Sequence, residues 1–212
     1  MSQEYRQREV REKTQQLLQG SLKHVRAAAL AAALVPVAAL AVSPAVAQVF
    51  SSGGATVPSP CDFTTSGGFV LTDGGKEANF GAHGGCKSDG FWGHVNYVDH
   101  TNGYHVDSVA IYGYLTPSPG SNIRDICGAA TTNNPSDPQP VLFRIRLIDN
   151  GEPGTADQFG IALSTGYMVR TRLLNAGVHG GGNIQLHGPN PSTAGPNPPP
   201  LEATMCGGVA AP

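Results

Sequence analysis

Apolar and polar residues alternate along much of the second half of the chain. Residues 141–149 read VLFRIRLID, with Val141, Phe143 and Ile145 on one side and two arginines on the other. Residues 157–164 repeat this period of two, since the apolar positions 159, 161 and 163 share one face. Such a period is typical of a β-strand with one buried face. The pattern therefore predicts strands here.

Turn signals divide the rest of the chain into short segments of the same kind. Asn102-Gly103 is a strong hairpin signal between the predicted strands 91–99 and 104–115. Further strands are predicted at 68–72, 78–83, 167–174 and 182–187, whereas the Pro/Asn/Ser-rich stretch 116–140 is predicted to be a loop. About eight short strands predict an all-β fold, namely an antiparallel β-sandwich, with an open β-barrel as the alternative.

The first 47 residues follow a different pattern. Basic residues precede sixteen uncharged residues at 27–42, and Ala45-Val46-Ala47 follows them. This order is typical of a helical signal peptide with an Ala-x-Ala cleavage site. An uncleaved membrane anchor is the alternative, but a spanning helix needs about 20 apolar residues, and Pro36 interrupts this shorter run.

These patterns predict four parts of the chain. They are a signal peptide at 1–47, a short flexible lead-in at 48–66, a β-sandwich domain at 67–188 and a Pro/Gly-rich tail at 189–212. We expect a protein that is secreted or at the cell surface, with no membrane span after cleavage.

Removing the leader changes the charge of the chain. The leader holds six of the 13 Lys and Arg residues and three of the 15 Asp and Glu residues. Seven basic and twelve acidic residues remain, which gives a net charge of −5. A nucleic-acid partner is not expected, because phosphate binding requires clustered Lys and Arg.

All four cysteines follow the leader, and an even number in an exported chain predicts two disulfides. The favoured pairing is Cys86–Cys127, which closes a central loop, with Cys61–Cys206, which ties the two ends of the domain together. A four-cysteine zinc site is a weaker alternative, because no two cysteines show the close spacing of such sites.

Several short motifs occur together in one part of the chain. They are DNGEPG at 149–154, D-x-F-x-I-x-L-S-x-G-Y at 157–167, GGNIQLH at 181–187 and GHVNYVDH at 93–100. Together they resemble the post-COAP-type domain, a module of secreted and surface proteins of bacteria. The resemblance covers about residues 66–187. It implies a secreted β-rich module and supplies no catalytic residues.

The acidic turn is the first candidate site, formed by Asp149, Asn150, Glu152 and Asp157. Carboxylate and amide oxygens are the ligands that Ca²⁺ prefers, so this turn is a candidate calcium site. The alternative is a purely structural turn, because Asn-Gly and Pro-Gly sequences form turns without any ligand. Glu152 and Asp157 are also the two carboxylates that a hydrolase would use as acid and base.

A second candidate is a transition-metal site formed by His94, His100 and His105 together with Asp99. Histidine is also an ordinary polar strand residue, so this assignment has a structural alternative. Six aromatic residues provide either a carbohydrate-stacking platform or cross-strand core pairs. They are Trp92, Tyr97, Tyr104, Tyr112, Tyr114 and Tyr167.

The features together favour a secreted, non-enzymatic module with a structural, adhesive or extracellular binding role. Calcium is its candidate stabiliser, and its partner is an extracellular ligand or surface polymer. The alternative is a secreted hydrolase or carbohydrate-binding protein that uses the acidic turn and the nearby aromatic residues.

Overall fold

The computed structural model describes residues 54–174, 181–189, 191 and 193–212, so the predicted signal peptide lies outside the described residues. The described chain forms one antiparallel sheet in the order β8-β7-β6-β5-β4-β3-β2-β1-β9. Its strands are β1 (Phe63–Leu71), β2 (Glu77–Lys87), β3 (Gly90–Asp99), β4 (Tyr104–Leu115), β5 (Ile123–Thr132), β6 (Val141–Ile148), β7 (Gln158–Leu163), β8 (Met168–Leu173) and β9 (Gly182–His187). The prediction of an all-β antiparallel fold is confirmed.

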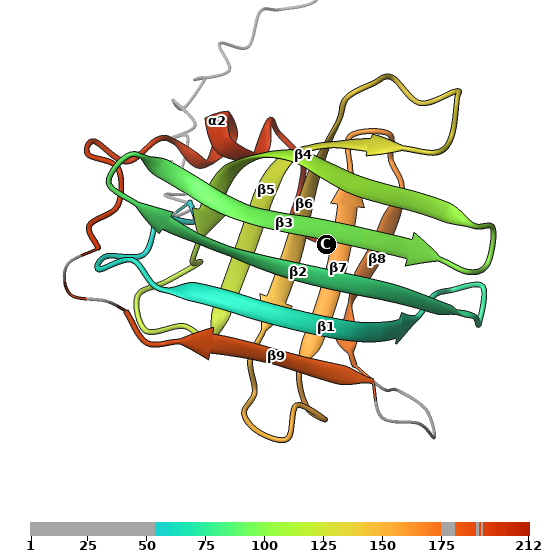
Figure 1. Cartoon of the computed structure of the whole chain (residues 1–212), viewed down its shortest axis with the longest axis horizontal. Helices are drawn as coiled ribbons and strands as arrows, with labels where there is room; N and C mark the ends of the chain where they lie inside the picture. The colour runs from blue at the N-terminus through green and yellow to red at the C-terminus, as the bar shows by residue number, and fades with distance from the viewer. Residues whose placement is uncertain (1–53, 175–180, 190, 192) are drawn as a thin grey trace, which may run out of the picture. The chain divides into compact units, whose positions relative to one another are not determined.

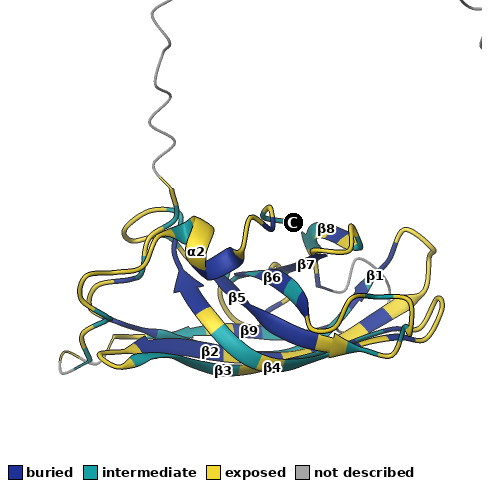
Figure 2. Cartoon of the chain, turned by 90° about the horizontal axis from the view of Figure 1, so that it is seen from above, coloured by how far each residue is buried: buried dark blue, intermediate teal, exposed yellow. Residues whose placement is uncertain are grey.

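The sheet curls on itself into a half-barrel, so that two halves of it face each other (Figure 1). Strands β9, β1, β2 and β3 form the front half, and β5 to β8 form the rear half (Figures 1 and 2). The long strand β4 connects the halves, and its pairing with β5 shifts register between Ser108 and Ala110 and between Ile111 and Gly113. Such bulges bend a strand, which is how β4 turns from one half to the other.

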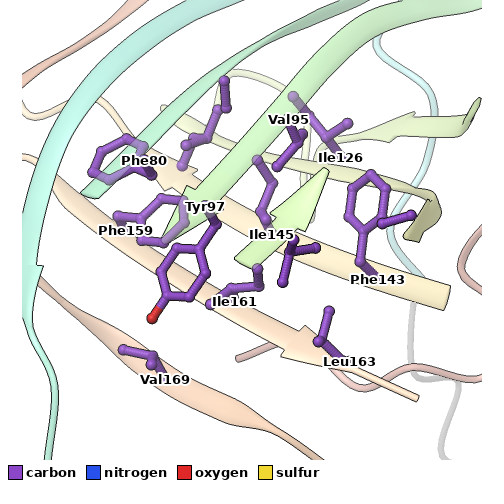
Figure 3. Packing of buried hydrophobic residues seen from close by; sticks show 14 of the residues in the cluster. Phe80, Val95, Tyr97, Ile126, Phe143, Ile145, Phe159, Ile161, Leu163 and Val169 are labelled. Carbon is purple, nitrogen blue, oxygen red and sulfur yellow. The ribbon is translucent and has the colours of Figure 1, made fainter. Parts of the chain in front are cut away.

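The hydrophobic core fills the space between the two halves (Figure 3). The alternation in 141–148 is confirmed, because Val141, Phe143 and Ile145 on β6 are fully buried. Phe80 of β2 stacks on Phe159 of β7 with ring centroids 3.9 Å apart, which joins the front and rear halves directly. Burying one such side chain stabilises the fold by about 1.5–3 kcal/mol relative to leaving it exposed.

Strand β5 corrects the prediction of a loop over 116–140. It occupies the middle of the sheet between β4 and β6 and is buried over most of its length. Its sequence IRDICGAATT shows no clear alternation, because both faces of the strand are covered and small residues suit a crowded position. Gly128 is one such residue, since a Cβ there would lie 2.1 Å from the carbonyl oxygen of Ala110.

The disulfides join Cys61 to Cys86 and Cys127 to Cys206, so the favoured pairing was wrong. Cys86 packs in the inner core, whereas Cys127 packs in a second cluster with Leu115. Alternate residues of a strand point to opposite faces, and Ile126 already faces inward. Cys127 therefore faces outward and cannot reach Cys86. Two disulfides fit an oxidising, extracellular environment.

The C-terminal segment covers the outer face of the rear half. Helix α2 (Glu202–Cys206) packs on β4, β5 and β6, and Met205 of the helix and Val209 after it are buried. The sequence predicted only a Pro/Gly-rich tail over 189–212, and the structure adds a short helix within it. Among the described residues, no helix has the length and apolar character needed to cross a membrane.

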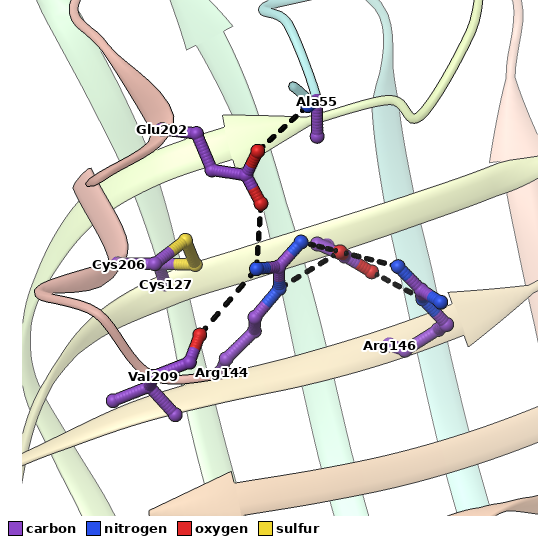
Figure 4. Close-up of a disulfide and its surroundings, with 8 residues drawn as sticks. Ala55, Cys127, Arg144, Arg146, Glu202, Cys206 and Val209 are labelled. Carbon is purple, nitrogen blue, oxygen red and sulfur yellow. Dashed lines mark hydrogen bonds and ion pairs between the residues drawn. A yellow bond between two sulfur atoms is a disulfide. The ribbon is translucent and has the colours of Figure 1, made fainter. Parts of the chain in front are cut away.

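A network of charged side chains lies beneath this segment (Figure 4). Arg144 donates to Asp125 on one side and forms an ion pair of 2.7 Å with Glu202 on the other. Arg146 binds the same Asp125 carboxylate, which is fully buried. Glu202 also accepts a hydrogen bond of 2.7 Å from the backbone N–H of Ala55. Because each buried charge has a partner, the network does not carry the cost of an isolated buried ion.

Candidate functional site

The acidic turn lies between β6 and β7, and its two aspartates bind strand β9. Asp157 accepts the backbone N–H of Asn150 at 2.8 Å on one oxygen and that of Ile184 at 2.7 Å on the other. Asp149 accepts the N–H of Gly151 at 2.9 Å and that of Leu186 at 2.7 Å. All four carboxylate oxygens therefore act as acceptors within the fold.

This arrangement provides hydrogen-bond acceptors for N–H groups on the edge of β9 that does not face β1. The strand pairs with β1 along one edge, and alternate N–H groups point away from β1. Ile184 and Leu186 supply two such groups, and the aspartates of the β6–β7 turn accept them. The acidic turn thus binds N–H groups of the edge strand β9 that do not take part in backbone pairing with β1.

The other two residues of the turn are also hydrogen-bonded. Asn150 donates to the carbonyl of Ala156 at 2.6 Å and accepts from Asn122 at 2.9 Å. Glu152 is exposed and accepts from Asn183 at 3.1 Å. The four predicted calcium ligands are thus neighbours in one turn. Calcium binding here stays a prediction, and the ion would have to displace N–H donors from the carboxylates.

The predicted histidine site is spread along one face of the sheet. His94 lies 3.2 Å from the hydroxyl of Ser108, His105 lies 2.9 Å from the amide of Asn96, and His100 binds Asn79. Each histidine therefore has a different partner. Within the residues that the structure describes, no group of three or more His, Cys, Asp and Glu side chains is arranged to hold a metal ion.

Most of the predicted aromatic platform is core. Tyr97, Tyr104 and Tyr114 are buried, whereas Trp92 is partly exposed. The hydroxyls of Tyr97 and Tyr167 are 2.7 Å apart, and Tyr167 donates to Asp99 at 2.8 Å. Burial raises the pKa of Tyr97 and of Tyr167 well above the usual range, so both hydroxyls stay protonated and act as internal donors.

Trp92 belongs instead to a group of rings on the outer face of the front half. We define the outer row as His187 on β9, Phe63 on β1, His83 on β2, and Trp92 and His94 on β3. Phe63 stacks on His187 with centroids 4.2 Å apart and lies 5.9 Å from Trp92. His83 lies 6.2 Å from Trp92 and 6.3 Å from His94, which completes the row.

A glycine of the sheet lets two rings of the outer row come close together. Gly85 lies opposite both Phe63 and Trp92 in the register, and a Cβ on it would lie 2.8 Å from each of them. The absence of a side chain lets the two rings lie over the backbone. Hydrogen-bonding groups border the rings, since Thr65 bonds His187 at 2.8 Å and Asp107 lies 3.3 Å from His94.

Sequence reasoning found only Trp92 and His94 of this row. Phe63 and His187 are adjacent because β9 pairs with β1, and nothing local in the sequence indicates that pairing. The hairpin of β2 and β3 brings His83 opposite His94, which a register prediction could have found.

A pocket of about 550 Å³ lies at one mouth of the half-barrel, next to the outer row. We call it the mouth pocket. Its walls come from the lead-in, the β4–β5 loop and the end of β9. Its lining residues are Thr56, Val57, Pro58, Ser59, Pro60, Asp62, Thr116, Pro119, Gly120, Ser121, Arg124, Leu186, His187, Gly188 and Pro189.

A buried ion pair contributes to the lining of the mouth pocket. Arg124 donates through Nε to Asp62 at 2.9 Å and pairs with the same carboxylate through Nη2. The hydroxyl of Tyr114 donates to Asp62 at 2.8 Å, and burial raises the pKa of that phenol well above its usual range. Burial alone would lower the pKa of Arg124, but its hydrogen bonds to Asp62 raise it.

No family model matches the chain, and neither does any curated protein or solved structure. The resemblance to the post-COAP-type domain therefore stays a prediction from its motifs.

Proposed function

We propose that the protein is a secreted, non-enzymatic module that binds an extracellular polymer on its outer row. The observation that carries the proposal is the row itself, in which five ring side chains from four strands line one face. Their neighbouring centroids lie 4.2–6.3 Å apart. A row of rings that crosses four strands suits an extended partner better than a compact one.

The chemistry of the row supports a binding role. Aromatic side chains contribute most of the energy at many binding surfaces, because they bury a large area with little loss of side-chain freedom. The bordering hydroxyl, amide and carboxylate groups of Thr65, Asn96 and Asp107 provide orientation through hydrogen bonds. The polar groups give selectivity, while the rings give affinity.

The use of the buried carboxylates supports a role without catalysis. Asp125 and Asp157 are both fully buried, and both oxygens of each accept hydrogen bonds from the protein. A general acid or base must reach a proton of the substrate. These carboxylates instead hold strands, loops and the C-terminal segment in place. The two disulfides support export, since they form in oxidising compartments.

Polymer binding can be tested by sedimentation. The protein, purified from an oxidising expression system, is mixed with insoluble cellulose, chitin, xylan or peptidoglycan, and the bound fraction is measured. We expect one of these polymers to retain the protein, and Trp92→Ala to weaken binding about tenfold, which is the loss of about 1.4 kcal/mol.

Met168→Ala is the matched control, because Met168 is an exposed apolar residue on β8, away from the outer row. This variant is expected to bind like the unchanged protein. Equal losses for Trp92→Ala and Met168→Ala, or no retention by any polymer, would overturn the proposal.

A further inference from the structure

We infer that the mouth pocket holds the end of an uncharged saccharide chain, whose following units lie along the outer row. This inference rests on the proposed function and names the chemical class of its partner. Mouths of β-barrels are a common place for ligand sites, and a volume of about 550 Å³ is within their usual range.

The walls of the pocket suit a ligand with a flat, largely apolar body. Four prolines line it, together with Val57 and Leu186. Proline rings and aliphatic side chains present C–H groups but no hydrogen-bond donors. A sugar ring also has faces made of C–H groups, so it buries apolar area against such walls.

The ion pair of Asp62 and Arg124 gives the pocket a donor beside an acceptor. Among the described residues, Nη2 of Arg124 donates only to Oδ2 of Asp62, and that oxygen accepts only this bond. Each of these two atoms thus has capacity for one more hydrogen bond. Neighbouring hydroxyls of a sugar match this pair, because a hydroxyl both donates and accepts.

The same pair excludes a charged ligand group. Asp62 and Arg124 neutralise each other, and they are the only Asp, Glu, Lys or Arg side chains among the lining residues. A carboxylate or an ammonium group entering the pocket would find no unpaired Asp, Glu, Lys or Arg side chain as a counter-charge, which makes its burial costly. The ligand chemistry that remains is neutral and rich in hydroxyls.

His187 connects the pocket with the outer row. It lines the pocket, and its ring stacks on Phe63 at 4.2 Å while bonding Thr65 at 2.8 Å. A chain that leaves the pocket at His187 therefore meets Phe63 and then Trp92. Stacked rings along this path can contact successive sugar units, which makes pocket and row one extended site.

Gly188 offers a way to fill the pocket without disturbing the fold. It lines the pocket, has no positive φ, and a Cβ on it would have no heavy atom within 4 Å. Gly188→Trp therefore places an indole at the wall of the pocket, whereas Gly188→Ala adds only a methyl group there. Thermal melts of both variants show whether the fold is retained.

Titration calorimetry tests the inference with neutral hexasaccharides of glucose, xylose, mannose and N-acetylglucosamine, and with oligogalacturonate as the anionic probe. We expect one neutral chain to bind more tightly than oligogalacturonate. Gly188→Trp should weaken it about tenfold or more, about 1.4 kcal/mol, and Gly188→Ala less than about twofold, below about 0.5 kcal/mol.

Three outcomes would overturn the inference. They are tighter binding of oligogalacturonate, unchanged affinity in Gly188→Trp, and occupation of the pocket by a fatty acid that Gly188→Trp displaces. If Trp92→Ala abolishes polymer binding while Gly188→Trp does not, the proposed function stands and the pocket is no part of the site. If no polymer is retained at all, the proposed function itself fails.

Discussion

Buried aspartates hold this protein together by accepting hydrogen bonds from groups that strand pairing leaves without a partner. Asp157 is fully buried and joins the backbone of the β6–β7 turn to the N–H of Ile184 on β9. Asp62 accepts a hydrogen bond from an arginine side chain of β5, and Asp125 accepts one from an arginine side chain of β6. A carboxylate suits these positions because it offers acceptors only, and every group facing it is a donor.

Asp157→Asn tests this role at a single residue. An amide keeps one acceptor but turns an N–H₂ group toward a backbone N–H, which leaves a buried donor without a partner. We expect a loss of about 1–3 kcal/mol in the free energy of unfolding, measured by urea denaturation.

Asp89→Asn is the control, because the side chain of Asp89 is 73% exposed and its ion pair with Lys87 spans 3.6 Å. This variant should change stability by less than about 0.5 kcal/mol. A loss in Asp157→Asn no larger than in Asp89→Asn would contradict the structural role.

At the scale of elements, the C-terminal segment covers the outer face of the rear half of the sheet. Helix α2 has only five residues, too few to be stable alone. It is held by the disulfide between Cys127 and Cys206, by the ion pair of Glu202 with Arg144, and by burial of Met205. The segment in turn shields the charges on β5 and β6 from water.

The two disulfides differ in the loops that they close, of 79 and 25 residues. In the chain-entropy model, removing Cys127–Cys206 costs about 1 kcal/mol more than removing Cys61–Cys86. Double Cys→Ser variants at each pair, compared by urea denaturation, measure this difference. Equal free energies of unfolding for the two variants would contradict this expectation from loop length.

The sequence predicted strands where apolar residues alternate and failed where charged residues are buried. Strand β6 alternates and was found, with Val141 as its first residue. Strand β5 was missed, because Arg124 and Asp125 are charged yet buried, and their partners lie elsewhere in the chain.

The acidic turn was located from the sequence, but its role in binding β9 was not predicted. The N–H groups that Asp157 and Asp149 accept are 27 and 37 residues away.

In the whole molecule, a few side chains hold the two halves of the sheet against each other. Phe80 and Phe159 stack across the core, and the hydroxyls of Tyr97 and Tyr167 meet at 2.7 Å. Arg172 of β8 donates to the carbonyl of Leu71 at 2.6 Å, at the end of β1. The two halves are therefore joined by side-chain contacts at the open side of the half-barrel as well as by the backbone of β4.

The tyrosines among these links make stability depend on pH. Burial is the main cause that raises the pKa of Tyr97, Tyr104, Tyr114 and Tyr167 above the ordinary value. The folded state therefore prefers the neutral phenol. Its stabilising effect is complete below the unfolded pKa of about 10 and is lost as pH rises above it.

We expect the free energy of unfolding to be constant near neutral pH and to fall steadily above about pH 10. Circular dichroism in urea at each pH measures the decline, and absorbance at 295 nm follows tyrosinate formation. Ionisation of all tyrosines near pH 10 with secondary structure intact would contradict the burial of these hydroxyls.

The position of β9 beside β1 sets an order of events in folding. Strand β1 begins at Phe63, and the strand that completes its edge ends at His187. A chain that crosses a membrane from its N-terminal end thus presents β1 with one edge unpaired until more than a hundred further residues have arrived. Long-range pairing of this kind is slow to form, and unpaired edges aggregate. The predicted export of this protein would therefore favour a route that delays collapse or protects β1 until the last strand has arrived.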